Sequence, residues 1–123
     1  MRALVIDDSR AVRAIIGTML RENGWEVVEA ANGQEGLDQL DRTAGIELVL
    51  VDWNMPVMDG LEFIQAVRAH RMYDSVNIVM VTTEAEHTQV VRAMTAGANE
   101  YVMKPFTKEI LAAKLSLLDA FKE

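Results

Sequence analysis

The strongest constraint on the fold is a fivefold alternation between a short apolar run and a stretch with helical periodicity. Apolar runs predict strands at residues 3–6, 25–30, 46–51, 76–81 and 100–103. Helical periodicity follows at residues 12–20, 33–42, 61–67 and 86–96, and from residue 107 onward. Short connections that each contain a helix require parallel strands with right-handed crossovers. The chain is therefore predicted to form a doubly wound α/β fold, with five parallel strands and five helices on both faces.

The apolar positions differ in how clearly they define each element. The first helix is the clearest, because one face collects Val12, Ile15, Ile16, Met19 and Leu20 before a stop at Asn23-Gly24. The last helix offers Ile110, Leu111, Leu115, Leu118 and Phe121 for packing. Gly36 weakens the second helix. The run 46–51 is almost entirely apolar, which is typical of a central strand covered on both faces.

Length and charge exclude several classes of protein. With 123 residues, half of them hydrophobic, the chain predicts a single domain over residues 1–123. A net charge of −7 and the lack of a basic stripe argue against nucleic-acid binding. No cysteine is present to form a disulfide or a thiolate metal site. No signal-peptide core or membrane span is found, so we expect a cytoplasmic protein without membrane insertion, and a monomer.

Polar residues follow four of the five predicted strands at the point where each strand ends. They are Asp7 and Asp8 after the first, Asp52 after the third, Thr82 and Thr83 after the fourth, and Lys104 after the fifth. In a parallel sheet all carboxyl ends lie at one edge, and ligands bind outside that edge. We therefore expect one site that contains all of these side chains.

The predicted site has the composition of a phosphoryl-transfer site. Three carboxylates repel one another without a cation, and ligands that are all oxygen favour Mg²⁺. Lys104 supplies a compact positive charge for phosphate oxygens, and the Thr82 hydroxyl can donate a further hydrogen bond. Asp52 is the best nucleophile candidate, because it ends the most apolar strand and begins the loop where a substrate would approach.

The same residues resemble the receiver domains of bacterial response regulators, most closely those of chemotaxis. The matching segments, in order along the chain, are Asp7-Asp8-Ser9, Asp52-Trp53-Asn54-Met55-Pro56, Met58-Asp59-Gly60, Thr82, Tyr101 and Lys104-Pro105-Phe106. They span essentially the whole chain, and the set is highly specific when all members occur together. The resemblance implies a flavodoxin-like sheet with strand order 2-1-3-4-5, which is carried over from the family.

The resemblance also implies a role for each site residue. A sensor histidine kinase would donate a phosphoryl group to Asp52, with Lys104 binding the phosphate. The direct Mg²⁺ ligands would be Asp8, Asp52 and the backbone carbonyl of Asn54, with Asp7 acting mainly through water. The Lys104-Pro105 bond would be cis. Thr82 and Tyr101 would move together and change a surface made by the fourth helix, fifth strand and fifth helix. Such a protein is a signalling switch with self-catalysed phosphotransfer and autodephosphorylation, not a conventional enzyme.

Three positions beside the site are expected to tune dephosphorylation. Asn54 and Glu84 match residues that do so in the family, while Thr83 stands where alanine, glycine or serine is common. A β-branched side chain at that position is predicted to restrict the path of attacking water. On the expected output face, Lys114 matches a basic residue that contacts the flagellar motor switch, whereas Leu117 departs from the family pattern.

Several alternatives remain open at this point. Within the receiver class, a stand-alone chemotaxis regulator is favoured over a phosphorelay intermediate or a receiver cut from a larger regulator. A phosphatase of the haloacid dehalogenase type needs an aspartate two residues after the nucleophile, where this chain has Asn54. Neither a P-loop nor a GxGxxG run is present, and acidic residues after the first strand disfavour a flavin-binding carrier.

Some individual side chains also have two interpretations. Asp8 or Ser9 fits the cap of the first helix as well as a site. His70 and His87 are predicted to be solvated, because neither has a second ligand at metal spacing. Trp53 belongs either to a partner-facing loop or to a shield over the site, and the sequence does not choose between them.

Overall fold

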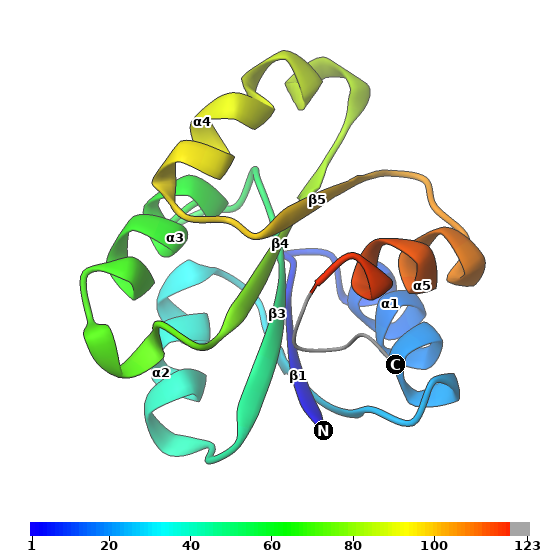
Figure 1. The fold of residues 1–123 in the computed structure, drawn as a ribbon, viewed down its shortest axis with the longest axis horizontal. Helices are drawn as coiled ribbons and strands as arrows, with labels where there is room; N and C mark the ends of the chain where they lie inside the picture. Colours follow the sequence, from blue (N-terminus) through cyan, green and yellow to red (C-terminus); the bar gives the residue numbers. More distant parts are fainter. Residues whose placement is uncertain (119–123) are drawn as a thin grey trace.

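Five parallel strands form one sheet with the order β2-β1-β3-β4-β5 in a computed structural model, which describes residues 1–118 (Figure 1). The strands are β1 (Arg2–Ile6), β2 (Glu26–Ala30), β3 (Ile46–Asp52), β4 (Asn77–Thr82) and β5 (Glu100–Met103). Every neighbouring pair is parallel. This confirms the α/β fold and the strand order expected from the sequence.

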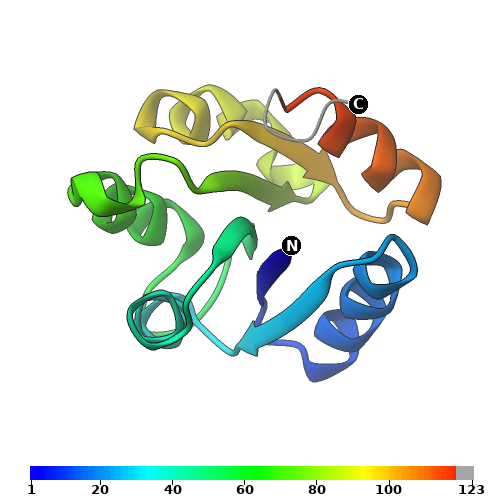
Figure 2. The same cartoon turned by 60° about the horizontal axis from the view of Figure 1, so that its bottom comes forward.

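Helices cover both faces of the sheet, as the alternating pattern predicted. They are α1 (Arg10–Glu22), α2 (Gly33–Arg42), α3 (Gly60–Arg68), α4 (Val90–Ala96) and α5 (Lys108–Ser116). Both views place α1 and α5 on one face and α2, α3 and α4 on the other (Figures 1 and 2). Within residues 1–118 no helix combines the length and apolar character needed to cross a membrane.

The apolar core lies in two layers, one on each side of the sheet. On β3, Leu48 and Leu50 belong to the layer under α1 and α5, whereas Val49 and Val51 belong to the layer under α2, α3 and α4. All four side chains are buried. A strand buried on both faces has no polar alternation, which explains the continuous apolar run in the sequence.

The fourth helical stretch differs from the single helix predicted near residues 86–96. A 3₁₀ helix, η2 (Glu84–Gln89), comes first, and α4 begins only at Val90. The carboxylate of Glu86 turns back to accept a hydrogen bond from the backbone N–H of Thr83, 2.9 Å away, which tightens this first turn. A second 3₁₀ turn, η1 (Arg71–Tyr73), follows α3, and Phe121 of the predicted last helix lies outside the described residues.

Gly36 is needed where α2 packs directly on the sheet. A Cβ atom at this position would lie 2.4 Å from Cδ1 of Ile6 and 3.0 Å from Cε1 of Phe63. Both neighbours are fully buried core side chains, so neither can move aside easily. The glycine that weakened the helix prediction is therefore explained by close packing.

Replacing Gly36 by alanine is expected to lower the free energy of unfolding by about 1 to 3 kcal/mol, because the added methyl group overpacks the core. Gly17→Ala in α1 is the matched control. A Cβ atom added at Gly17 would lie 3.2 Å from the flexible end of the Arg21 side chain, which can move aside. The free energy of unfolding of Gly17→Ala should therefore be unchanged, or rise by up to about 1 kcal/mol because alanine favours the helix. Urea unfolding of both variants tests this, and equal effects at the two glycines would contradict the packing argument.

Candidate functional site

The side chains of the candidate site lie together because four strands end at one edge of the sheet. Asp52 is the last residue of β3 and pairs in register with Val81 of β4, one residue before Thr82. The backbone N–H of Lys104, just after β5, donates to the carbonyl of Thr82 at 2.7 Å. The backbone N–H of Asp7, just after β1, donates to Ala30 at 3.1 Å. These backbone bonds hold the strand ends in fixed relative positions.

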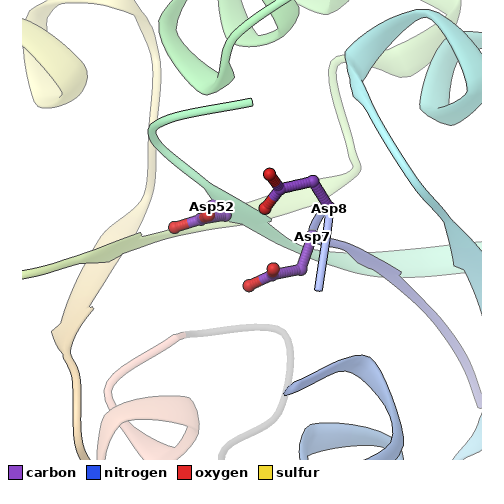
Figure 3. Close-up of side chains that lie close together, drawn as sticks. All are labelled: Asp7, Asp8 and Asp52. Carbon is purple, nitrogen blue, oxygen red and sulfur yellow. The ribbon is translucent and has the colours of Figure 1, made fainter. Parts of the chain in front are cut away.

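Asp7, Asp8 and Asp52 form an acidic cluster in which one oxygen from each carboxylate lies within 4.8 Å of the others. Figure 3 shows the three side chains lying close together. Asp7 and Asp52 are buried, and Asp8 is exposed. A compact group of hard oxygen donors without His or Cys is the type of ligand set that Mg²⁺ prefers. The cluster is therefore capable of holding a metal ion.

The helix cap next to this cluster is made by Ser9. Its hydroxyl oxygen accepts the backbone N–H of Val12 at 3.2 Å, while Asp7 Oδ1 accepts the backbone N–H of Ser9 at 2.8 Å. This arrangement resolves one open alternative, because Ser9 and not Asp8 caps α1. Asp8 remains with the carboxylate cluster.

Lys104 is the cation of the site. Its Nζ lies 2.9 Å from Oδ2 of Asp7 and 3.3 Å from Oδ1 of Asp52, so one ammonium group contacts both buried carboxylates. The peptide bond between Lys104 and Pro105 is cis. Burial alone would lower the pKa of Lys104, but its hydrogen bond to Asp7 and the charges of Asp52 and Asp7 raise that pKa overall. Lys104 is therefore held in its charged form.

Asp52 is in an environment that opposes its ionisation. Burial, followed by the negative charge of Asp7, raises the pKa of Asp52 to about 6, although the charge and hydrogen bond of Lys104 act in the opposite direction. A smaller increase comes from Glu86. Lys104 therefore offsets only part of the combined effect of burial and of Asp7, and an additional cation would favour the ionised form of Asp52.

Thr82 carries a buried hydroxyl for which the described part of the chain supplies no hydrogen-bond partner. The residue is fully buried at the end of β4, beside the strand that ends at Asp52. Nearly all buried polar atoms in proteins are paired, and an unpaired one calls for an explanation. An additional acceptor at this edge of the sheet would satisfy the hydroxyl.

Glu86 is a buried carboxylate near the site that the sequence analysis did not include. Its Oε1 accepts the backbone N–H of Thr83, and its Oε2 accepts the side-chain amide of Asn54. The spacing of Thr83 and Glu86 is that of a capping box, a sequence signal that could have revealed the contact. Glu84, the other acidic residue of this turn, is exposed.

Tyr101 lies on β5 and is half-buried. The Nζ of Lys114 lies 4.3 Å from the centre of the Tyr101 ring, which is a cation–π distance. The ring of His87 lies 5.6 Å from the same centre. His87 is exposed as predicted, but it also contacts this aromatic ring, which the sequence did not indicate. These three side chains join η2, β5 and α5.

Trp53 packs into the core beneath α2, α3 and α4 and is only 6% exposed. Its backbone N–H donates to Val81 and its carbonyl accepts from Gly60, so the residue continues the sheet edge. This burial removes the partner-facing alternative for Trp53. The side chain contributes to packing beneath the site.

The comparisons with known proteins agree with this geometry. Residues 3–116 match the family described as "Response regulator receiver domain". "Chemotaxis protein CheY1" of Helicobacter pylori is 41% identical over 119 residues, which are 96% of each chain. "Chemotaxis protein CheY homolog" of Campylobacter jejuni is 43% identical over 116 residues, 94% of this chain and 89% of the relative. The chain belongs to the receiver domain family of response regulators.

Solved structures show the same relationship. The chemotaxis response regulator CheY4 of Vibrio cholerae superposes with a TM-score of 0.86 at 35% identity, over 94% of this chain and 96% of that one. A response regulator/GGDEF domain protein superposes with a TM-score of 0.91 at 31% identity, over all of this chain and 51% of that one. The fold thus matches both a chain of similar length and one part of a longer chain.

The pKa of Asp52 predicts how stability depends on pH when no metal ion is present. The folded protein keeps the Asp52 proton up to about pH 6, whereas an unperturbed aspartate loses it near 3.8. The folded state therefore binds more protons in this range, and stability falls as the pH rises from about 4 to about 6. Asp52→Asn should remove this fall and stabilise the protein by about 1 to 3 kcal/mol at pH 7.5, but not at pH 3.5.

Urea unfolding in the presence of a chelator at both pH values measures the effect. Asp38→Asn, on the exposed surface of α2, is the matched control and should follow the pH dependence of the parent protein. An Asp52→Asn variant that is no more stable than the parent at pH 7.5 would show that the buried charge is not destabilising.

Proposed function

We propose that the protein is a chemotaxis response regulator in which Asp52 accepts a phosphoryl group from a sensor histidine kinase. One arrangement carries the proposal: a buried aspartate is grouped with two further carboxylates and a lysine, and the neighbouring strand ends in a buried hydroxyl that has no hydrogen-bond partner within residues 1–118. The carboxylates fit a metal ion, the lysine fits a phosphate, and the hydroxyl fits an additional oxygen acceptor. Together these groups match the requirements of phosphoryl transfer.

In the proposed reaction an oxygen of the Asp52 carboxylate forms a bond to phosphorus, and the bond from phosphorus to the donor imidazole breaks. The leaving nitrogen keeps the electron pair, so the donor histidine becomes neutral after its ring is protonated. Bound Mg²⁺ would supply positive charge to offset the charge of the phosphoryl oxygens. Its ligands would be Asp8, Asp52 and the backbone carbonyl of Asn54, with Asp7 acting through water.

Lys104 and Thr82 would then bind the new group on Asp52. The Nζ of Lys104 already lies 3.3 Å from Asp52, so a phosphoryl oxygen there would remain within its reach. The Thr82 hydroxyl would gain an acceptor that it lacks in the described structure. A shift of Thr82 toward the phosphate is a local change at the end of β4, which leads directly into η2.

The proposed output surface consists of α4, β5 and α5, with Tyr101 at its centre. Tyr101 contacts His87 of η2 and Lys114 of α5, so a displaced η2 changes the surroundings of the ring. Inward rotation of Tyr101 would break its contact with Lys114, which also pairs with Glu100 at 3.7 Å, and would alter the surface presented to a partner. The chemotaxis relatives support the flagellar motor switch as that partner, whereas a phosphorelay intermediate would pass the phosphoryl group to another protein.

Asp52 is expected to be the sole phosphoacceptor. Incubation with acetyl phosphate and Mg²⁺ should add one phosphoryl group, and peptide mapping should place it on Asp52. Asp52→Asn should abolish labelling, because an amide is not a nucleophile for this reaction. Asp38→Asn should label like the parent protein. Label that persists in Asp52→Asn, or that appears on serine or threonine in the parent, would refute the assignment.

Thr83 is expected to restrict water access to the phosphorylated site. Thr83→Ala should shorten the lifetime of phospho-Asp52 by a factor of about three, equivalent to less than 1 kcal/mol in the barrier, without changing Mg²⁺ affinity. Thr83→Ser removes the branch and should act like alanine, whereas Thr83→Val retains the branch and should act like the parent. A phosphate-release assay provides the rates, and an unchanged or longer lifetime in Thr83→Ala would rule out this role.

A further inference from the structure

Glu86 is a buried carboxylate that the proposed chemistry does not yet use. It is 8% exposed, as deeply buried as Asp52 at 7%. Burial of an ionised carboxylate is costly unless hydrogen bonds compensate. Among the described residues, the backbone N–H of Thr83 donates to Oε1 of Glu86, and the side-chain amide of Asn54 donates to Oε2. Glu86 thus joins the loop after β4 to the loop after β3.

The contact with Glu86 determines which way the Asn54 amide faces. An ionised carboxylate can only accept hydrogen bonds, and an asparagine amide has one donor end and one acceptor end. The NH₂ end of Asn54 must therefore face Glu86, which leaves the carbonyl oxygen Oδ1 free for another donor. Without Glu86 the amide could rotate, because the Asn54 side chain is exposed. Asn54 lies two residues after Asp52 in the sequence.

We propose that Glu86 is a positioning residue for hydrolysis of the phosphoryl group on Asp52, acting by presenting Oδ1 of Asn54 to the attacking water. This inference rests on the proposed phosphorylation of Asp52. Water that donates a hydrogen bond to Oδ1 is restricted in orientation, with its oxygen lone pair available for phosphorus. The new bond to phosphorus replaces the bond to the Asp52 carboxylate, which leaves with its electron pair, and both water protons remain on the released phosphate.

Two substitutions at Glu86 separate positioning from capping. Glu86→Ala removes both hydrogen bonds. Glu86→Gln retains an oxygen to cap Thr83, but then directs its NH₂ group at Asn54, so the exposed amide of Asn54 must turn its oxygen away from the water. Hydrolysis should slow about fivefold in both variants, the effect of losing one positioning hydrogen bond.

Glu62→Ala is the matched control, because Glu62 makes the same type of capping box at the start of α3. Its carboxylate accepts the backbone N–H of Asp59 at 3.1 Å. Both Glu62→Ala and Glu86→Ala should lower thermal stability, because each removes a cap. Only Glu62→Ala should leave the lifetime of phospho-Asp52 unchanged. If Glu86 were only a cap, the Ala variants at positions 62 and 86 would behave alike in both measurements.

The experiment loads each variant with acetyl phosphate and Mg²⁺, removes the donor and follows phosphate release. NMR of the Asn54 side-chain NH₂ gives an independent readout without phosphate, with resonances expected to move in both Glu86 variants and not in Glu62→Ala. In a double-mutant cycle, Asn54→Ala combined with Glu86→Ala should hydrolyse no more slowly than Asn54→Ala alone.

The outcomes distinguish this inference from the proposed function. A parent protein that takes up no phosphoryl group would refute the proposed function itself. A parent that is phosphorylated, with lifetimes in both Glu86 variants within twofold of its own, would overturn the role of Glu86. Independent, multiplicative effects of Asn54→Ala and Glu86→Ala would also overturn it, because Glu86 would then not act through Asn54.

Discussion

The contact of Lys104 with both Asp7 and Asp52 is the interaction on which the site depends. Two buried carboxylates at the end of neighbouring strands would repel each other, and one ammonium group at 2.9 Å and 3.3 Å offsets only part of this repulsion. Burial of Asp52, followed by the negative charge of Asp7, raises the pKa of Asp52 to about 6 in spite of Lys104. The fold thus places an excess of negative charge at one edge of the sheet. Under the proposed function, a bound metal ion would offset this charge when a phosphoryl group is accepted there.

The parallel sheet makes this arrangement stable, because the strands that carry the charged residues are buried in two apolar layers. The segment after β4 contains the 3₁₀ helix η2 (Glu84–Gln89). In this helix Glu86 contacts Asn54, and the next residue, His87, contacts Tyr101. A change at Thr82 would therefore have a short route to the proposed output surface, along the backbone through η2 to the contact between His87 and Tyr101.

Much of the fold and of the candidate site could be predicted from the sequence. Apolar runs that end abruptly at Asp7, Asp52, Thr82 and Lys104 predicted both the sheet and the residues that meet at the candidate site, because the carboxyl ends of parallel strands share one edge. The 3₁₀ turn and the role of Glu86 as a buried link were not predicted, since they depend on how two loops fit together in three dimensions. The need for Gly36 likewise depends on the distance between α2 and Ile6, which periodicity does not reveal.

The most direct test of the central claim is a crystal structure of the protein with Mg²⁺ and beryllofluoride, a stable mimic of the phosphoryl group. The account predicts beryllium bonded to an oxygen of Asp52, Mg²⁺ bound by Asp8 and Asp52, and fluorine atoms within hydrogen-bond distance of Lys104 Nζ and Thr82 Oγ1. A beryllofluoride group bound at another residue, or a Thr82 hydroxyl still without an acceptor beside an occupied Asp52, would contradict it.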